Sequence, residues 1–529
     1  MTEVFTGTQV RDAERPLVEA GHGPALMQQA ASGLAAQVLR SLRQRGRIYG
    51  AGVTALVGSG NNGADALYAL LRLRRRGVRT RAVLVSERCH EAALTAYREA
   101  GGRTLPRVPG HQDVIIDAVL GTGASRRAEP MPIPGLGEAL RPDARHEARG
   151  GIQRPGTQRP ETQRPEIIAC DIPSGVSADT GEVLSDYGLT ADRTVTFGAV
   201  KLGLVVGAGA VLSGQIHCVD IGLGPHLPQA SARLLETPSA GDRAEPDEAP
   251  STTSGASSIE LRELSGQDHK YARGVVHVVA GSTQYPGAAQ LSVAAAVGTG
   301  AGMVTVDSEA QVSARVTAVH PEVVALPTDQ ALRRADAVAL GPGLTGEAAD
   351  EETLESVLAW SQSGGGILVL DASGIGLLSP ERLRSGALTP NVVLTPHAGE
   401  LHRLVSRIDE VHGTRVLREE DGDSPVASAR AVAAHLGAVV LLKGASTVIA
   451  EPHGSVIVHR CRAPGLATAG SGDVLTGVIG ALAAHDGRVG DMAALGSHIH
   501  AAAAHQIDPR GAGAFGAADL VAGIRRYRS

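Results

Sequence analysis

Short runs of Val, Ile and Leu alternate with helical stretches along most of this chain, and most of the runs end directly in Gly, Asp or Thr-Pro. This alternation is typical of α/β proteins, in which crossover helices join parallel strands. Ligands bind open sheets of this kind beyond the carboxyl ends of the strands, so the residues that follow each run are the candidates for chemistry. The predicted strands are Val53–Val57, Arg81–Val85, Val114–Ile116, Ile167–Cys170, Thr194–Phe197, Val275–Ala280, Ala337–Leu340, Ile367–Leu370, Val392–Leu394 and Val439–Leu442.

Two segments interrupt the alternation and predict the domain organisation. Pro142–Glu166 contains three Gln-Arg-Pro repeats and no apolar face, which indicates an exposed insertion after a short crossover helix near Leu136–Leu140. Glu236–Ser258 is rich in Pro, Ser, Thr, Ala, Glu and Asp, a composition typical of a flexible linker. Because a single core rarely grows beyond about 250–300 residues, we expect domains at 1–235 and 259–529 of the 529-residue chain.

Composition excludes several classes of function. Lys and Arg total 49 and Asp and Glu total 55, a formal net charge of −6, and the chain holds only 3 Phe, 1 Trp and 7 Tyr. No nucleic-acid partner is expected, because an excess of basic residues and stacking aromatics are both missing. The N-terminus lacks the pattern of a signal peptide, Ala288–Val306 is too weakly apolar for a membrane span, and the four separated cysteines form no Cys-x-x-Cys motif. These features predict a cytoplasmic protein without a membrane partner.

The first half carries a glycine-rich loop between a strand and a helix. Val53–Val57 runs into Gly58–Asp65, which reads Gly-Ser-Gly-Asn-Asn-Gly-Ala-Asp. Free backbone N–H groups and the helix dipole make such a loop a candidate anion site, and the adjacent Asn61 and Asn62 add amide groups that could bind a ligand or a cation. A tight turn without a ligand is the alternative.

Two aspartates end further predicted strands in this half. Asp117 follows Val114–Ile116, and Asp171 follows Ile167–Cys170. Each could be only a helix N-cap, but two of them beside a phosphate loop indicate one crevice. Asn62, Asp117 and Ser174 would supply hard oxygen ligands with one carboxylate, a set that suits a monovalent cation better than zinc.

These motifs resemble the NAD(P)H-hydrate epimerase family. Four motifs carry the resemblance: the loop at 58–65, Asp-Ala-Val-Leu-Gly-Thr-Gly at 117–123, Asp-Ile-Pro-Ser-Gly at 171–175 and Thr-Val-Thr-Phe-Gly-x-x-Lys at 194–201. The chain departs from the family pattern at Ala64 and Ala66, where the family usually has glycine. It implies a Rossmann-like three-layer sandwich, potassium bound by Asn62, Asp117 and Ser174, and Asp171 as the acid/base. The resemblance implies that the hydrated dinucleotide contacts Asn61, Asn62, Gly63, Ala64, Asp65, Gly121, Thr122, Gly123, Ala124, Ser125, Arg126, Arg127 and Asp171.

The second half contains a glycine loop with an acidic residue at a helix start. In Ala467–Leu475 the sequence Gly-Ser-Gly-Asp precedes an apolar helix, which would place backbone donors and the carboxylate of Asp473 around a transferred phosphate. An aspartate that only caps the helix is the alternative. No Gly-x4-Gly-Lys-Ser/Thr loop is present. Other polar or glycine-rich strand ends are Tyr285–Ala288, Gly341–Gly343, Thr395–Glu400 and Lys443–Thr447.

Together with Asp371-Ala372-Ser373-Gly374, these motifs resemble the ADP-dependent NAD(P)H-hydrate dehydratase family, which has a ribokinase-like fold. The resemblance implies contacts to the hydrated nicotinamide dinucleotide by Ala288, Gly343, His397 and Asp473. It implies contacts to the adenine nucleotide by Lys443, Gly444, Ala445, Ser446, Thr447 and Gly472.

Both resemblances in one chain imply a bifunctional enzyme of nicotinamide nucleotide repair. The first half would interconvert the R and S hydrates of NADH or NADPH with K⁺, and the second would dehydrate the S epimer with ADP and Mg²⁺. We expect these small molecules as partners and a homo-oligomeric assembly. The alternative hypothesis is a ribokinase-like small-molecule kinase fused to a non-catalytic nucleotide-binding domain, because Gly-x-Gly-Asp alone serves both chemistries.

Overall fold

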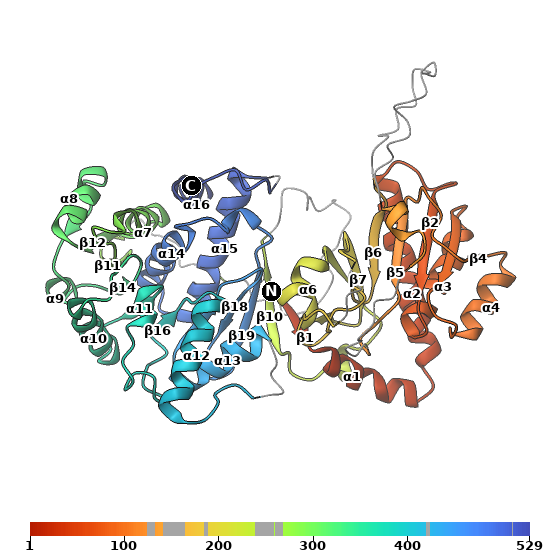
Figure 1. Ribbon diagram of the computed structural model, residues 1–529, viewed down its shortest axis with the longest axis horizontal. Helices are drawn as coiled ribbons and strands as arrows, with labels where there is room; N and C mark the ends of the chain where they lie inside the picture. The colour runs from red at the N-terminus through yellow and green to blue at the C-terminus, as the bar shows by residue number, and fades with distance from the viewer. Residues whose placement is uncertain are drawn as a thin grey trace, which may run out of the picture. The chain divides into compact units, whose positions relative to one another are not determined.

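The computed structural model forms two compact units, one of residues 3–231 and one of residues 1–2 and 232–529 (Figure 1). Most of the predicted insertion and most of the predicted linker lie outside the residues that the structure describes; Glu166, predicted as the end of the insertion, is the first residue of strand β6 (Glu166–Cys170). The described residues are 1–123, 133–140, 164–184, 189–237, 259, 268–418, 424–509 and 511–528.

The first unit is built on a parallel sheet with the strand order β4-β3-β2-β5-β6-β7-β9. Strand β1 (Thr2–Phe5) pairs in parallel with β8 (Val200–Lys201), outside this seven-stranded sheet. The sheet strands are β2 (Gly52–Val57), β3 (Arg79–Leu84), β4 (Arg103–Leu105), β5 (Val114–Ala118), β6 (Glu166–Cys170), β7 (Arg193–Phe197) and β9 (Gln215–Val219). The helices are α1 (Gly7–Glu19), α2 (Gly23–Gln44), α3 (Asn61–Arg74), α4 (Glu91–Glu99), α5 (Leu136–Ala139) and α6 (Gly207–Leu212).

Both faces of this sheet are buried. Val53 and Val57 of β2 pack with Leu34 of α2 and Leu67 of α3 in one apolar cluster. Side chains from the opposite face of the sheet, among them Leu56, form a second cluster that includes Ala139 of α5. Because successive side chains of a strand point to opposite faces, and both faces are buried here, β2 carries no polar side chain except Thr54, whose hydroxyl donates to Oε1 of Gln112 at 2.8 Å. The predicted α/β class with helices on both faces is confirmed for this unit.

The glycine-rich loop lets the chain pass close to the neighbouring strand end. A Cβ at Gly58 would lie 1.9 Å from the carbonyl oxygen of Val119, and a Cβ at Gly63 would lie 2.3 Å from the oxygen of Gly58. Ala64 and Ala66 are fully buried inside α3 with helical backbone, and neither is among the residues with positive φ. The two departures from the family pattern therefore carry no left-handed backbone cost.

The second unit has a sheet with the order β13-β12-β11-β14-β15-β16-β17-β18-β19-β10. Its strands run parallel except for the antiparallel pairs of β18 with β17 and β19. The strands are β10 (Ala232–Glu236), β11 (Val275–Val279), β12 (Met303–Asp307), β13 (Val324–Ala325), β14 (Ala337–Leu340), β15 (Ile367–Leu370), β16 (Val392–Leu394), β17 (Val439–Leu442), β18 (Thr447–Ala450) and β19 (Val456–Arg460).

Helix α14 (Ser471–His485) lies at the centre of this unit, against β11, β14 and β15 and between α7 and α15 (Figure 1).

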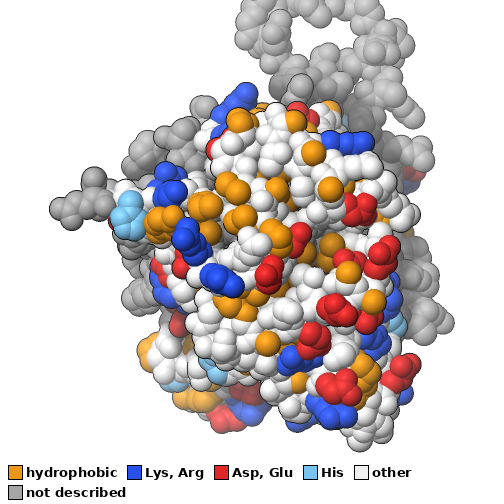
Figure 2. Space-filling view, turned by 90° about the vertical axis from the view of Figure 1, so that its left-hand side faces the viewer, with side chains coloured by type: hydrophobic (Ala, Val, Ile, Leu, Met, Phe, Trp, Pro, Cys, Tyr) orange, Lys and Arg blue, Asp and Glu red, His pale blue; other side chains and the backbone are white. Residues whose placement is uncertain are grey.

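On the face shown in Figure 2, basic and acidic side chains lie among hydrophobic ones. Among the described helices none is both long and apolar enough to cross a membrane. The other helices are α7 (Pro286–Thr299), α8 (Ala310–Val319), α9 (Thr328–Ala331), α10 (Ala348–Gln362), α11 (Ser373–Gly376), α12 (Ala398–His412), α13 (Pro425–Leu436), α15 (Val489–Ile507) and α16 (Ala517–Arg528).

All ten predicted strands are present, each with ends within two residues of those expected. The sequence analysis did not predict β12, because it treated Ala288–Val306 as one Ala/Gly-rich stretch that in fact contains most of α7 and β12. The observed division falls at residue 231 instead of 235, because β10 pairs in parallel with β19 of the second unit. Glu236, placed in the linker from composition, is the last residue of β10.

We predict that Gly58→Ala destabilises the first unit. The new Cβ meets a backbone oxygen that belongs to a buried strand connection, and overpacking of this kind costs about 1–3 kcal/mol. Scanning calorimetry of the full chain should show a lower midpoint for one unfolding transition. Gly110→Ala is the matched control, because a Cβ there meets no atom within 4 Å. Equal midpoints for the two variants would contradict the close approach at Gly58.

Two candidate active sites

The first turn of α3 lies against the ends of β5 and β6. The side chain of Asn62 donates from Nδ2 to the carbonyl oxygen of Cys170 at 2.7 Å and to that of Leu120 at 3.3 Å. A Cβ at Gly121 would lie 2.7 Å from Asn62 Oδ1. The structure therefore brings the predicted loop residues together with the loop that follows β5 and with the residue that precedes Asp171.

Asp117 and Ser174 form a fully buried polar pair beside this turn. The Ser174 hydroxyl donates to Asp117 Oδ1 at 2.6 Å, and its backbone N–H donates to Oδ2 at 2.9 Å. Burial raises the pKa of Asp117, and the hydrogen bonds from Ser174 oppose this shift. The same hydroxyl accepts from the backbone N–H of Leu120 at 2.9 Å, next to the Asn62 contact. The half-buried Asn62 is thus linked to the buried pair of Asp117 and Ser174 through Leu120.

Asp171 has a left-handed backbone, with φ of +67°, and no helix begins at it among the described elements, so it is not an N-cap. Its Oδ1 accepts from Lys201 Nζ at 2.5 Å, from Thr196 Oγ1 at 3.1 Å and from the backbone N–H of Phe197 at 3.2 Å. Lys201 is 1% exposed. A strained residue held by so many contacts is typical of a functional site. The sequence analysis quoted Lys201 within a motif but did not predict it as a site residue.

Two more carboxyl groups lie near this ion pair. Burial, followed by the negative charges of Asp171 and Glu14, raises the pKa of Asp65 well above its ordinary value. Burial also raises the pKa of Glu14, against the opposing charge of Lys201. Asp65 was predicted to contact the dinucleotide, whereas Glu14 was not predicted as a site residue. Only the fold brings α1 to the carboxyl end of β6.

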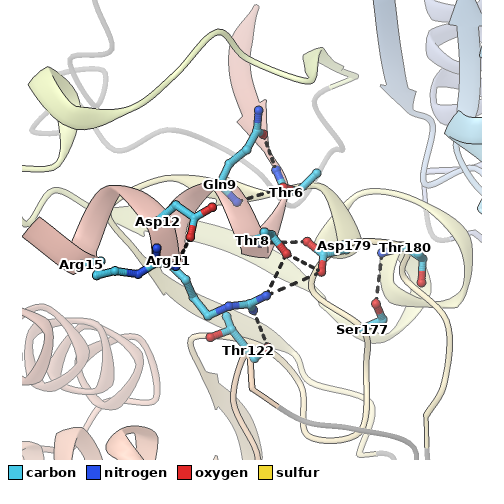
Figure 3. A network of polar contacts seen from close by, with 10 residues as sticks. All are labelled: Thr6, Thr8, Gln9, Arg11, Asp12, Arg15, Thr122, Ser177, Asp179 and Thr180. Atoms are coloured by element: carbon cyan, nitrogen blue, oxygen red, sulfur yellow. Dashed lines mark hydrogen bonds and ion pairs between the residues drawn. The ribbon is translucent and has the colours of Figure 1, made fainter. Parts of the chain in front are cut away.

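Helix α1 also holds one of the predicted binding loops (Figure 3). Arg11 donates from Nη1 to the carbonyl oxygen of Thr122 at 2.6 Å and from Nη2 to the hydroxyl of Thr8 at 2.8 Å. Thr8 in turn donates to the carboxylate of Asp179 from its backbone N–H and its hydroxyl. The described part of the loop, Gly121 to Gly123, is thereby tied to α1. The other predicted loop residues, Ala124, Ser125, Arg126 and Arg127, lie outside the described part of the chain.

In the second unit, α14 begins directly after Gly470, which has φ of +84°. Asp473 is the third residue of this helix and therefore lies in its first turn, not at the cap. Burial and the charge of Asp371 raise the pKa of Asp473 to about 6, while Lys443 opposes the shift. A carboxyl group with this pKa is largely ionised at neutral pH and still basic enough to accept a proton.

Asp371 lies between Asp473, whose pKa its charge raises, and Lys443, the first of the predicted nucleotide residues. Its Oδ1 accepts from Lys443 Nζ at 2.7 Å and its Oδ2 accepts from the hydroxyl of Thr476 at 2.8 Å. A Cβ at Gly472 would lie 3.6 Å from Lys443 Nζ. Asp371 is 1% exposed and thus forms a buried ion pair at the carboxyl end of β15. The sequence analysis quoted it for the family resemblance alone; its position at a strand end was the available signal.

Ala288 and Gly343 meet beside the start of α14. A Cβ at Gly343 would lie 2.7 Å from the Cβ of Ala288, and one at Gly470 would lie 2.6 Å from Leu291 of the same helix α7. Ser292 donates its hydroxyl to the carbonyl oxygen of Asp473 at 3.0 Å. Two of the residues predicted to contact the dinucleotide are therefore held next to the predicted base.

His397 lies beside Lys443, because the backbone N–H of Lys443 donates to the carbonyl oxygen of Pro396 at 2.8 Å. The imidazole caps α12 by accepting from the backbone N–H of Gly399 at 3.0 Å, so it also has a structural role. Its side chain is 55% exposed and could still contact a ligand.

The remaining predicted nucleotide residues follow Lys443. Gly444 and Ala445 lie in the turn between β17 and β18. Ser446 is 6% exposed, and its Oγ finds no hydrogen-bond partner among the described residues. Thr447 begins β18, and its hydroxyl lies 3.5 Å from Cys461 Sγ. A buried hydroxyl without a partner is consistent with a place for a ligand.

The fold and these strand-end constellations define a two-unit α/β protein with one candidate active site in each unit. The family described as YjeF-related protein N-terminus matches residues 23–203, and the family described as NAD(P)H-hydrate dehydratase matches residues 276–524. The bifunctional NAD(P)H-hydrate repair enzyme Nnr of Mycobacterium tuberculosis is 38% identical over 93% of this chain and 92% of its own length. The chain belongs to the family of bifunctional NAD(P)H-hydrate repair enzymes.

Two further proteins are similar to this chain. The enzyme of the same name from Moorella thermoacetica is 32% identical over 90% of this chain and 87% of its own length. The ADP/ATP-dependent NAD(P)H-hydrate dehydratase of Bacillus subtilis, co-crystallized with ATP and Mg²⁺, is 26% identical over 51% of this chain and 95% of its own, with a TM-score of 0.41. A small-molecule kinase fused to a non-catalytic domain is not favoured, because the full-length relatives are bifunctional repair enzymes.

We predict that Asp473→Asn stabilises the protein at pH 7.5. The folded state raises the pKa of Asp473 to about 6, so above that pH folding must bury a charge that the unfolded chain leaves in water. The gain in thermal midpoint should shrink as the pH falls from 6 toward 4, where the carboxyl is protonated in both states. A gain of equal size at pH 7.5 and pH 4.5, or a loss at pH 7.5, would contradict the raised pKa.

Proposed function

We propose that the first unit interconverts the R and S hydrates of NADH and NADPH and that the second dehydrates the S epimer with ADP. The observation that carries this proposal is the same in both units: a Lys-paired carboxylate at a strand end lies near a second carboxyl whose pKa is raised. Two carboxyl groups in such different environments can take different roles in proton transfer within one site. Membership of the repair-enzyme family supports the substrate assignment.

In the first unit, Asp171 is the base. Three donors, from Lys201, Thr196 and Phe197, all reach Oδ1 and stabilise the ionised carboxylate. No described residue donates a hydrogen bond to Oδ2, so this oxygen is left to take a proton from the hydroxyl of the hydrated ring. Asn61 to Asp65 and Gly121 to Arg127 hold the dinucleotide around it.

Potassium fits the region formed by Asn62, Asp117 and Ser174. Asp117 is fully buried, with hydrogen bonds from Ser174 and a third from the backbone N–H of Val119. One carboxylate among neutral oxygen groups suits a large monovalent cation. The ion would supply a fixed positive charge that compensates the buried carboxylate and favours binding of the anionic substrate.

In the second unit, Asp473 takes the proton of the ring hydroxyl of the S hydrate. The resulting oxygen attacks the terminal phosphorus of ADP, the new O–P bond forms, and AMP leaves. The ring nitrogen then expels the phosphate with cleavage of the C–O bond, and loss of a proton restores NAD(P)H. Phosphate is a far better leaving group than hydroxide, which is why the nucleotide is consumed.

Lys443 lies where it can neutralise charge on the nucleotide, because its ammonium group is adjacent to Gly472. Gly444, Ala445, Ser446 and Thr447 continue the nucleotide site. Mg²⁺ would enter with the nucleotide and neutralise its phosphates. Ala288, Gly343 and His397 contact the dinucleotide. We further propose that the chain works in the cytoplasm, as a homo-oligomer.

We predict that Asp473→Asn loses dehydration by about 10²–10⁴-fold, the usual contribution of a positioned base, while nucleotide binding is retained. The assay adds ADP to mixed hydrate epimers and follows the return of NADH absorbance, with the epimer ratio measured by chromatography. Epimerisation should continue at the wild-type rate, since the substituted residue lies in the other unit. Dehydration at the wild-type rate would remove Asp473 from the mechanism.

Asp171→Ala should have the complementary effect. With ADP present, the S hydrate should be consumed at the wild-type rate, while the R hydrate disappears only at its slow spontaneous rate of epimerisation. Circular dichroism should show an intact fold for this variant. If both hydrates still vanish together, the epimerase site lies elsewhere in the chain.

A further inference from the structure

Asp65 has a buried carboxyl group, one oxygen of which accepts no hydrogen bond from a described residue. It is 6% exposed, and its Oδ1 has no hydrogen-bond partner among the described residues. It lies one helical turn after Asn62, whose side chain donates to the carbonyl oxygen of Cys170 at 2.7 Å. The first turn of α3 is therefore fixed at the end of β6, where Asp171 follows directly.

The charges around Asp65 do not compensate an ionised carboxylate. Its charged neighbours are Asp171 at the end of β6, Glu14 of α1 and Lys201 after β7, and the thiol of Cys170 is also close. Lys201 already donates to Asp171 at 2.5 Å, to Thr196 at 3.0 Å and to the carbonyl oxygen of Phe197 at 2.8 Å. Asp171, Glu14 and Asp65 therefore share one cation, Lys201. Asp65 is buried and accepts no hydrogen bond from a described residue, so its neutral, protonated form is favoured.

We propose that Asp65 is the proton donor of the first site and acts as the acid partner of the base Asp171. This inference rests on the proposed epimerase function, and it assigns to Asp65 a chemical step beyond contact with the dinucleotide. The hydrated carbon carries both a hydroxyl group and the ring nitrogen, so its configuration is reversed by opening and closing the bond between carbon and nitrogen.

The step balances with these two groups alone. Asp171 takes the hydroxyl proton, the C–N bond breaks with its electron pair going to nitrogen, and nitrogen takes the proton of Asp65. The product is an open-chain aldehyde, which rotates about the adjacent C–C single bond. When the ring closes on the other face, the nitrogen returns its proton to Asp65 and Asp171 gives its proton to the aldehyde oxygen, so both carboxyl groups regain their starting states.

The test uses Asp65→Asn in the full-length chain, with epimerisation of the purified R hydrate followed by chromatography. Asparagine keeps the size and the neutral charge of a protonated aspartate but cannot transfer a proton. We expect kcat to fall by about 10²–10⁴-fold with KM within a few-fold of wild type, and Asp65→Glu to recover part of the rate. Dehydration of the S hydrate should be unchanged.

The pH profile supplies a readout that a structural role would not move. The wild-type rate should decline at alkaline pH as Asp65 loses its proton, and the residual activity of Asp65→Asn should lack this decline. Asp12→Asn, an exposed substitution on α1, is the matched control and should match wild type in rate and profile.

Three results would overturn the inference: a wild-type kcat for Asp65→Asn, a raised KM with unchanged kcat, or an alkaline decline that persists in this variant. Each would leave the epimerase assignment standing, because the wild-type chain would still epimerise. A wild-type chain that does not epimerise at all would instead refute the proposed function itself.

Discussion

The chemistry of both units depends on a buried ion pair between an aspartate at a strand end and a lysine from a later part of the chain. In the first unit the pair is Asp171 and Lys201, and in the second it is Asp371 and Lys443. Loss of one partner from a buried pair leaves an uncompensated charge, which typically costs about 3–5 kcal/mol. Each pair therefore holds the strand ends together around its aspartate.

The ion pair also sets the protonation of its neighbour. The negative charges of Asp171 and Asp371 contribute to the raised pKa values of Asp65 and Asp473, respectively. Burial is the larger cause in each case. Asp65 is the fifth residue and Asp473 the third residue of a helix that begins directly after a glycine-rich loop. The same local structure thus holds the proposed base Asp473 in the second unit and the proposed acid Asp65 in the first. Asp65 is buried more deeply than Asp473, which favours its protonated form more strongly.

Much of this arrangement could be predicted from the sequence. Buried parallel strands require apolar residues on both faces, so β2, β14 and β17 stand out as continuous runs. The antiparallel strands β18 and β19 were not predicted, because no Gly-rich two-residue turn marks their connection. Glu14 and Lys201 were missed as site residues because their roles come from contacts with distant parts of the chain, which no local pattern reports. Asp371 was missed although its position at a strand end was a local signal.

The central claim is that the two units carry separate sites that act in sequence on a diffusing substrate. An equal mixture of the Asp171→Ala and Asp473→Asn variants tests it directly, with ADP and both hydrate epimers supplied and NADH absorbance followed. The Asp473→Asn chain would supply the S epimer and the Asp171→Ala chain would dehydrate it, so the account predicts full conversion of both epimers. An R hydrate that persists in the mixture as long as it does with Asp171→Ala alone would contradict the account.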